Sequence, residues 1–516
     1  MIEVEVHQHL RRLLRQQRSP SGGGDTGWPH QLTMARLVAR GLRLQRHALI
    51  QVPAGDAHQL SYLLPALMWP GATIICAPHE VQSQLVYGSV PQLQAALELQ
   101  KPVLQGDRFP AGFDGVLVVD PLVWLRDRLG RGAGETARFP VDVPLIIDRA
   151  EDIERLAQQA LTVTLTGDDW HRLELAIPQL ASQLRDVRVA LMSKFSRRPL
   201  NQFLLHSDEQ SLLDGAINRA IELQSQLPGN SQLPGAWGQL QTYREQADWV
   251  LWAERQTELQ ECSIHLSPVK LDSLLAERLW STQAVVMIGE ALDIDREATS
   301  YRQRMGLPDL TTLRFLPDRQ ERVVHLYTPA PFPAPNNPQF RDRLLPALKQ
   351  LVARTTQGPA VILISDRPLL AQVGTALAAE FGSRVRVNDS YEAERGVLVC
   401  DWQYWLERKT QLATPALLAI ATLPFPSVED PLVAGRVNYL KQLRQDWFRD
   451  YLLPIAASHL QRAVSPLRGT GGLVAIFDIR TIARSYGKQL LDNLTPTQMV
   501  AERDIQEHLA GREAEV

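Results

Sequence analysis

The feature that most constrains the fold of this chain is a short segment near its amino terminus, residues 47–67. An apolar run, HALIQV, is followed by the small-residue turn PAGDA and then by the amphipathic pattern HQLSYLLPAL. A strand, a tight turn and a helix in this order are typical of the first βα unit of a parallel-sheet α/β domain. Phosphate-binding loops of the form GxxxxGKS or GxxxxGKT use the same frame.

The turn, however, lacks the residues that bind phosphate. In a working loop the backbone amides cradle the phosphates, the lysine reaches the β and γ oxygens, and the hydroxyl holds Mg²⁺. Here Gly55 lies within the turn, but the corresponding places hold Pro53, Ala57, His58 and Gln59. Histidine is shorter than lysine and mostly neutral near pH 7, and glutamine offers an amide in place of a hydroxyl. The segment therefore predicts the frame of a P-loop without its chemistry.

Composition limits the class of protein. The chain has 516 residues, 45% of them hydrophobic and 22% charged, so it can bury more than one core and we expect two or three domains. Nothing resembles a signal peptide and no apolar run approaches the ~20 residues of a membrane span, so we expect a soluble, cytoplasmic protein with no membrane partner. Cys76, Cys262 and Cys400 lack CxxC spacing, which favours buried thiols over metal ligands or disulfides. The net charge of −3 does not favour a nucleic-acid partner, although a local basic groove can coexist with it.

The first third of the chain divides into a basic segment and an α/β series. Residues 1–25 carry Arg11, Arg12, Arg15 and Arg18 before a Gly-rich stretch, which predicts a short amphipathic helix and a flexible joint. From 26 to 167, apolar runs alternate with helix-length segments; the runs are 48–52, 72–77, 115–119, 145–148 and 161–166. Strands spaced in this way imply βαβ crossovers and a parallel sheet.

An insertion and a second α/β series follow. Residues 168–275 have a helical pattern rich in Leu, Gln and Arg, and an apolar run returns at 284–288, so the first domain is predicted to comprise 26–167 and 276–320 around a mostly helical insertion. The proline-rich stretch 328–338 indicates an interdomain connector. The second domain, 321–516, has apolar runs at 360–365, 384–387, 396–400, 416–422 and 473–478. We therefore expect an α/β protein with two parallel-sheet domains that pack across a cleft.

Short motifs occur in order along these two halves. They are WPHQLTM at 28–34, with Gln31; CAPHEVQSQL at 76–85; GVLVVDPLVWL at 115–125; LIIDRAEDIE at 145–154; LSPVKL at 266–271; VVMIGEAL at 285–292; VLVCDWQYWLE at 397–407; LPFPSVEDPL at 423–432; QRAVSPLR at 461–468, with Gln461; and Tyr486-Gly487. In this order they resemble the motifs of DinG/XPD-like superfamily 2 helicases over nearly the whole chain, and the LPFPxxxDPL element is distinctive. The resemblance implies two RecA-like P-loop NTPase-type domains with an arch-like helical insertion in the first.

The second motif departs from the family pattern at catalytic positions. Where the family has IIDEAHNLE, Asp148 is kept, Arg149 replaces the Glu that would orient or deprotonate the attacking water, and Glu151 replaces the His. A guanidinium cannot accept a proton at any useful pH. A cation a few ångströms from the Mg²⁺ site also opposes metal binding, by ~4 kcal/mol per unit charge.

The fifth and sixth motifs depart as well. The fifth has Arg408-Lys409 where the family pattern ends in an Asp, and in the sixth Ser465 stands at one arginine-finger position while Arg468 remains. A single arginine finger contributes ~10³–10⁵ in rate. The degenerate catalytic positions are thus Asp148, Arg149 and Arg468, and the chain is predicted to be ATPase-deficient.

The resemblance also implies cofactors. ATP with Mg²⁺ would lie at the family positions held here by Gln31, Gly55, His58, Gln59 and Gln461, although the replaced residues oppose its binding. Cluster-bearing members of the family have four cysteines between the first strand pair and the second motif. Residues 86–144 contain none, so we expect no iron–sulfur cluster and no other metal.

Several residues keep two interpretations. Asp148 either holds a metal or forms a structural ion pair with Arg149, and Arg468 either contacts an anion across the cleft or braces the two domains. His58 and His79 favour turn or cap roles over metal ligation. The basic run in 1–25 is either a solvated helix face or a nucleic-acid contact. Four tryptophans of the insertion either pack in a core or stack on bases; they are Trp170, Trp237, Trp249 and Trp252.

Three hypotheses about function follow. The first is a helicase-fold protein without ATP turnover that acts in DNA repair or replication as a scaffold for a protein partner or as a weak, salt-sensitive binder of single-stranded DNA. The second is a divergent but active ATP-dependent DNA helicase. The third is a nucleotide or small-anion sensor that uses the cleft without turnover.

Overall fold

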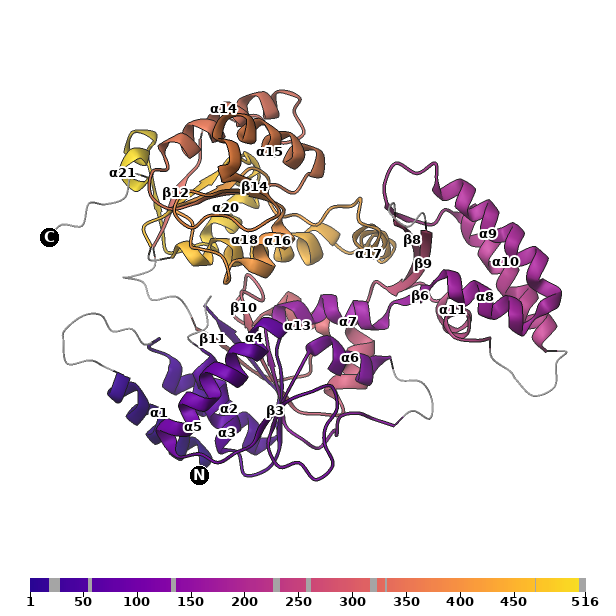
Figure 1. The fold of residues 1–516 in the computed structure, drawn as a ribbon, viewed down its shortest axis with the longest axis horizontal. Helices are drawn as coiled ribbons and strands as arrows, with labels where there is room; N and C mark the ends of the chain where they lie inside the picture. Colours follow the sequence, from indigo (N-terminus) through magenta and orange to yellow (C-terminus); the bar gives the residue numbers. More distant parts are fainter. Residues whose placement is uncertain are drawn as a thin grey trace.

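The computed structural model describes residues 1–17, 28–53, 58–130, 136–225, 233–256, 261–315, 323–329, 332–468 and 470–509. Within them the chain forms two seven-stranded parallel sheets, each in its own domain, and a smaller module that extends from the first domain (Figure 1). The predicted fold class, two RecA-like parallel-sheet domains, is confirmed.

The first sheet has the strand order β11-β1-β10-β5-β2-β4-β3. Its strands are β1 (Ala48–Val52), β2 (Thr73–Cys76), β3 (Val103–Gln105), β4 (Val116–Val119), β5 (Leu145–Asp148), β10 (Val285–Glu290) and β11 (Thr311–Arg314). Strands β1, β2, β4 and β5 are buried throughout, which explains why they are almost continuously aliphatic. Val52 pairs with Glu290 and Ile288 with Asp148, so the carboxyl ends of β1, β10 and β5 meet at one edge.

Helices pack on both faces of this sheet. They are α2 (Gln31–Leu44), α3 (Gln59–Met68), α4 (His79–Gln84), α5 (Val90–Leu97), α6 (Pro121–Leu129), α7 (Ile153–Leu161), α12 (Asp272–Leu275) and α13 (Thr299–Met305). The predicted amino-terminal helix is α1 (Ile2–Gln17), and its buried Val6, Leu10 and Leu13 join the core that also contains α2. Residues 1–17 are thus packed on the first domain, with Arg11 and Arg12 on the exposed face. The joint predicted after them lies among residues 18–27, outside the described residues.

The insertion consists mostly of helices, but it also contains a sheet that the sequence pattern did not predict. It contains α8 (Gly167–Ala176), α9 (Ala181–Phe195), α10 (Ser207–Gln224) and α11 (Ala236–Tyr243), together with a four-stranded antiparallel sheet in the order β6-β9-β8-β7. The strands are β6 (Val163–Leu165), β7 (Gln202–Leu204), β8 (Trp249–Gln256) and β9 (Glu261–Pro268). The run at 161–166 was expected in the parallel sheet, but β6 pairs with β9, about 100 residues later in the chain. Such a non-local pairing leaves no periodic signal in the sequence.

The insertion's tryptophans are core residues, and the base-stacking interpretation is wrong for them. Trp170, Trp237, Trp249 and Trp252 are each at most 8% exposed. Trp170 and Trp237 contact edge to face, and Trp252 stacks on His265 with ring centroids 4.1 Å apart. These rings are already covered by protein, so they present no face to a base.

The second sheet has the order β14-β15-β13-β16-β17-β12-β18. Its strands are β12 (Val324–Tyr327), β13 (Ala360–Leu363), β14 (Val385–Val387), β15 (Val397–Cys400), β16 (Leu417–Ile420), β17 (Leu473–Ile476) and β18 (Thr497–Met499). Its helices are α14 (Gln339–Arg354), α15 (Arg367–Phe381), α16 (Trp402–Arg408), α17 (Pro431–Gln442), α18 (Leu453–Val464), α19 (Arg480–Ala483), α20 (Gly487–Asp492) and α21 (Ile505–Leu509).

The predicted interdomain connector is misplaced. Strand β12, which precedes the proline-rich stretch 328–338, already pairs with β17 and β18 of the second sheet. The described part of that stretch therefore lies inside the second domain, and the chain passes between the domains after β11 and before β12. Proline occurs wherever a backbone N–H is not needed, so a proline-rich stretch is found in internal loops as well as in linkers between domains. None of the described helices is long and apolar enough to cross a membrane.

Candidate functional site

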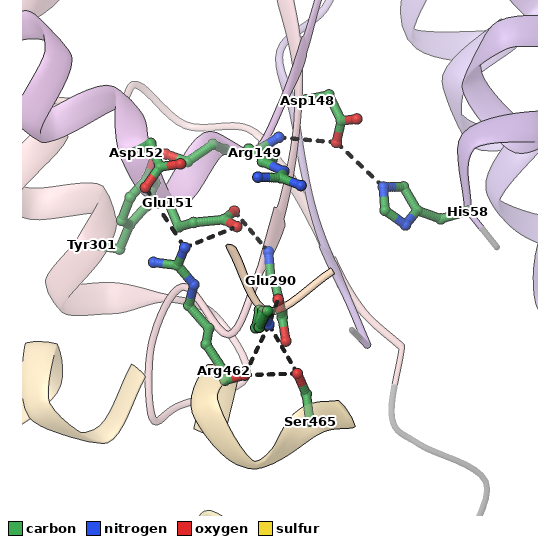
Figure 2. Close-up of polar contacts among 11 residues, drawn as sticks. His58, Asp148, Arg149, Glu151, Asp152, Glu290, Tyr301, Arg462 and Ser465 are labelled. Atoms are coloured by element: carbon green, nitrogen blue, oxygen red, sulfur yellow. Dashed lines mark hydrogen bonds and ion pairs between the residues drawn. The ribbon is translucent and has the colours of Figure 1, made fainter. Parts of the chain in front are cut away.

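Asp148 lies at the carboxyl end of β5, in the cleft between the domains, and both of its carboxylate oxygens accept hydrogen bonds; Figure 2 shows those from His58 and Arg149. Oδ1 accepts hydrogen bonds from His58 Nε2 at 3.2 Å and from the Arg149 backbone N–H at 2.9 Å, and Oδ2 accepts one from the Tyr62 hydroxyl at 2.8 Å. The residue is 3% exposed. Burial by itself would raise the pKa of Asp148, but the bonds from His58 and Tyr62 and the Arg149 charge outweigh it and lower the pKa. Asp148 is therefore a buried carboxylate whose two oxygens are both hydrogen-bonded to protein groups.

Arg149 begins a tight turn that directs the carboxylates of Glu151 and Asp152 toward the second domain. Its backbone is left-handed, with φ 58° and ψ 52°, a conformation that costs a non-glycine residue roughly 1–2 kcal/mol. The turn leads into the short 3₁₀ helix η2 (Ala150–Asp152). The Tyr301 hydroxyl donates a hydrogen bond to the Ala150 carbonyl at 2.6 Å and so stabilises the start of this helix. The expected side-chain partner of Asp148 was Arg149, but in the structure the side chains that contact its carboxylate are those of His58 and Tyr62.

Glu151 and Asp152, on η2, face Arg462 of α18 in the other domain (Figure 2). Arg462 Nη2 lies 3.7 Å from Glu151 Oε1 and 3.6 Å from Asp152 Oδ1. Glu151 Oε2 also accepts from the Glu290 backbone N–H at 2.9 Å. Burial raises the pKa of Glu151 to about 7 against the lowering effect of Arg462, and neighbouring Asp152 and Glu290 add to the rise.

Lys409 follows α16 and reaches across the cleft. Its Nζ donates to Glu290 Oε2 at 2.8 Å, to the Arg462 carbonyl at 2.8 Å and to Ser465 Oγ at 2.9 Å. A lysine ammonium has three donors, so each has a partner. Lys409 is only 7% exposed, and burial lowers its pKa although the Glu290 charge partly opposes that effect.

A third cross-domain contact lies on the side of the cleft that faces the insertion. Glu154, in the first turn of α7, accepts from Arg436 Nη1 of α17 at 2.5 Å and from Arg304 Nε of α13 at 2.9 Å. The Arg436 guanidinium also lies over the Tyr451 ring, 4.3 Å from its centroid. Burial alone would raise the pKa of Glu154, but Arg304 and Arg436 lower it to about 2.

Little space remains among these groups. The described residues around His58, Asp148, Glu290, Lys409 and Arg462 enclose a cavity of about 30 Å³. Ligand pockets usually measure roughly 300–1,000 Å³, so this cavity is far smaller than a typical one. Among the described residues, no group of three or more His, Cys, Asp or Glu side chains is arranged to hold a metal ion.

The other predicted site residues lie apart from this cavity. Gln31 and Gln59 are buried at the starts of α2 and α3, and Gly55 falls outside the described residues. Gln461 lines a separate crevice of about 610 Å³ between the domains. Arg468 donates to the Leu494 carbonyl at 2.8 Å within the second domain, so this bond serves neither of its two expected roles.

The basic group that crosses the cleft from α18 is Arg462, which sequence reasoning missed. It lies within the sixth motif, between Gln461 and Ser465, and resemblance drew attention to the neighbouring positions instead. Lys409 was noticed as a departure but had no assigned partner. The signal that could have joined them is a compensating pattern: acids gained by the second motif and a lysine gained by the fifth.

The sequence of the chain is similar to those of known DNA helicases. No protein-family model matches the chain. It is 21% identical over 430 residues to the ATP-dependent DNA helicase YoaA of Escherichia coli, covering 74% of this chain and 67% of that protein. It is 23% identical over 278 residues to the ATP-dependent DNA helicase DinG of Photobacterium profundum, covering 49% of this chain and only 40% of that relative.

Solved structures show the same architecture. A structure of S. tokodaii Xpd4 matches with a TM-score of 0.59 and 14% identity, covering 92% of this chain and 100% of that one, and a structure titled XPD helicase also gives 0.59, at 11% identity. The facing RecA-like sheets thus define a two-domain helicase-fold protein. In sequence the chain is similar to the DNA helicases YoaA and DinG, and in fold it is similar to XPD helicases.

Proposed function

We propose that this chain is a helicase-fold nucleic-acid-binding or scaffold protein that does not hydrolyse ATP. The observation that carries the proposal is the state of Asp148. In the family this carboxylate would hold Mg²⁺, yet here three donors from His58, Tyr62 and the Arg149 backbone occupy its oxygens. Mg²⁺ demands an octahedral set of oxygens and usually keeps several waters. At Asp148 both carboxylate oxygens are already hydrogen-bonded to protein groups, which opposes their use as Mg²⁺ ligands.

The residues around this carboxylate also do not fit the phosphates of ATP. His58, at the position of the P-loop lysine, points to Asp148 (Figure 2). Arg149 stands where a general base is needed, and a guanidinium does not take up a proton. The domain-spanning bonds of Lys409 and Arg462 fill the place where the two domains would close on a nucleotide. These features together support the absence of turnover.

The nucleic-acid partner is inferred from the similarity to DNA helicases, and binding of a nucleic acid does not require the ATPase residues. The relatives are named DNA helicases, and backbone contacts to DNA need only basic side chains on a suitable face. With a net charge of −3, we expect weak, salt-sensitive and sequence-indifferent binding to single-stranded DNA, in roughly the micromolar range. A role in DNA repair or replication is inferred from the family resemblance.

The test of the proposal is ATP hydrolysis by the purified protein with and without single-stranded DNA. We expect the wild type and the Asp148→Ala variant to release phosphate at the same background rate. Helicase-like hydrolysis that the Asp148→Ala change abolishes would overturn the proposal and establish a divergent motor.

Binding is measured separately, by fluorescence anisotropy of a labelled single strand at low and raised salt. We expect an affinity that falls as salt rises and does not change when ATP and Mg²⁺ are added. Absence of binding at low salt would leave the scaffold as the remaining form of the proposal. An affinity that responds strongly to ATP would again point to a motor.

A further inference from the structure

The cleft contains a segregated set of charges. Glu151, Asp152, Glu154 and Glu290 belong to the first domain, and the cations that meet them, Lys409, Arg436 and Arg462, belong to the second. Each cation crosses from one domain to the other, so separating the domains would break all three contacts at once. We call these seven residues the interdomain latch.

The latch is largely sheltered from solvent. The side chains of Lys409, Arg462 and Glu151 are 6–7% exposed, and those of Glu290 and Arg436 are 14% exposed. Salt screens such buried pairs much less than it screens surface pairs. Lys409 and Glu290 pair with each other, so removing either one leaves the other as a buried charge without its partner, which is the costly way to break an ion pair.

A second contact holds the domains together beyond the cleft. Helix α17 of the second domain packs on the antiparallel sheet of the insertion, as Figure 1 shows. At Gly435 a Cβ atom would lie 2.7 Å from a methyl group of Val250 on β8 and 3.2 Å from one of Val269. Glycine is required for this close approach, and Arg436, the next residue, carries the latch contact to Glu154.

We propose that the interdomain latch holds the two domains closed in the absence of any nucleotide, with carboxylates of the first domain in the place where a motor would use nucleotide phosphates to draw in the basic groups of the second. Domain closure in this chain is then built into its own side chains. As a consequence, the two domains keep one relative orientation, and the addition of nucleotide does not close them further.

The proposal is tested by charge reversal across the Lys409–Glu290 pair. Lys409→Glu and Glu290→Lys each place two like charges at a separation of about 3 Å, so each should open the cleft. We expect small-angle scattering to show a larger radius of gyration, and amide hydrogen exchange to become at least about tenfold faster in segments 149–152 and 462–467. The double variant restores the opposite-charge pair and should regain the wild-type scattering and exchange.

The control is Lys349→Glu, which reverses an exposed Lys–Glu pair of similar length. Lys349 lies 2.7 Å from Glu380 in the second domain, with the two side chains 35% and 45% exposed, and does not touch the first domain's acids. This variant should leave both measurements unchanged. If a reversal at 409 or 290 disrupts folding, as judged by circular dichroism, the neutral pair Lys409→Met and Glu290→Gln, singly and together, is measured in its place.

Two results would refute the latch. One is wild-type scattering and exchange in the folded Lys409 and Glu290 variants. The other is a wild-type protein that is open alone and closes when ATP and Mg²⁺ are added. Neither result depends on hydrolysis, so a protein that hydrolyses ATP while its domains stay closed would refute the proposed function and leave the latch intact.

Discussion

Replacing Glu154 by glutamine should lower the free energy of unfolding at neutral pH and leave it unchanged in strong acid. The pKa of Glu154 is lowered from 4.5 to about 2 because Arg304 and Arg436 outweigh the effect of burial. The two values differ by about 2.5, and one pKa unit corresponds to about 1.36 kcal/mol, so the ionised carboxylate contributes about 3 kcal/mol to the free energy of unfolding. Because the folded pKa is the lower one, this contribution is complete above pH 4.5 and is lost as the pH falls toward 2.

The assay is urea unfolding of the wild type and of Glu154→Gln between pH 7 and pH 2, followed by tryptophan fluorescence. The difference in unfolding free energy should be about 3 kcal/mol at pH 7 and should shrink toward zero near pH 2. Asp208→Asn, which removes the carboxylate of an exposed pair with Lys194, is the control and should change little at any pH. A Glu154→Gln effect that is the same at pH 7 and pH 2 would refute the electrostatic explanation.

Three further predictions follow from the cleft and its surroundings. Because burial raises the pKa of Glu151 from 4.5 to about 7, the stability of the wild type relative to Glu151→Gln should fall as the pH rises from 4.5 to 7 and be constant above it; the opposite slope in urea unfolding would contradict this. The quadruple variant His58→Lys, Gln59→Thr, Arg149→Glu, Ser465→Arg should remain without ATPase activity. The Ser465 hydroxyl accepts a hydrogen bond from Lys409, so a guanidinium at position 465 would lie against the Lys409 ammonium and be repelled by it. ATPase activity of this variant in a phosphate-release assay would contradict the prediction. Gly435→Ala should destabilise the protein through its clash with Val250, whereas Gly215→Ala, in α10 with open space around it, should stabilise it by roughly 0.5–1 kcal/mol; equal shifts in the urea midpoint would argue against close packing of α17 on the insertion.

Local pattern was a good guide to the two sheets. The buried strands β1, β2, β4, β5, β13, β15, β16 and β17 are apolar runs of four or five residues separated by helix-length segments, and each was expected close to where it lies. The short strands β3, β11, β12 and β18 were not recognised, because three or four residues that are only partly buried carry too weak an apolar signal. In the insertion, β8 has consecutive buried residues at 251–253, so it lacks the alternation that marks a half-buried strand.

The candidate site, like the fold, was predicted from the sequence in part and needed the tertiary structure for the rest. Once the motifs resembled those of DinG/XPD-like helicases, the residue types at 58, 149 and 465 predicted a degenerate nucleotide cleft, because each chemical role requires a specific functional group. Nothing in the chain near Asp148 indicated that His58 and Tyr62 would bind its oxygens, since they lie 90 and 86 residues away along the sequence.

The ion pairs between the domains needed the tertiary structure. Lys409 and Glu290 are separated by 119 residues, and Arg436 and Glu154 by 282. Composition and periodicity report which residues prefer to be buried and which local structures they form, and these preferences specified two α/β domains. An ion pair depends on the position of two charges to within an ångström or so, and that position is set by the packing of β10, α16, α17 and α18 against one another across the cleft, which no short stretch of sequence contains.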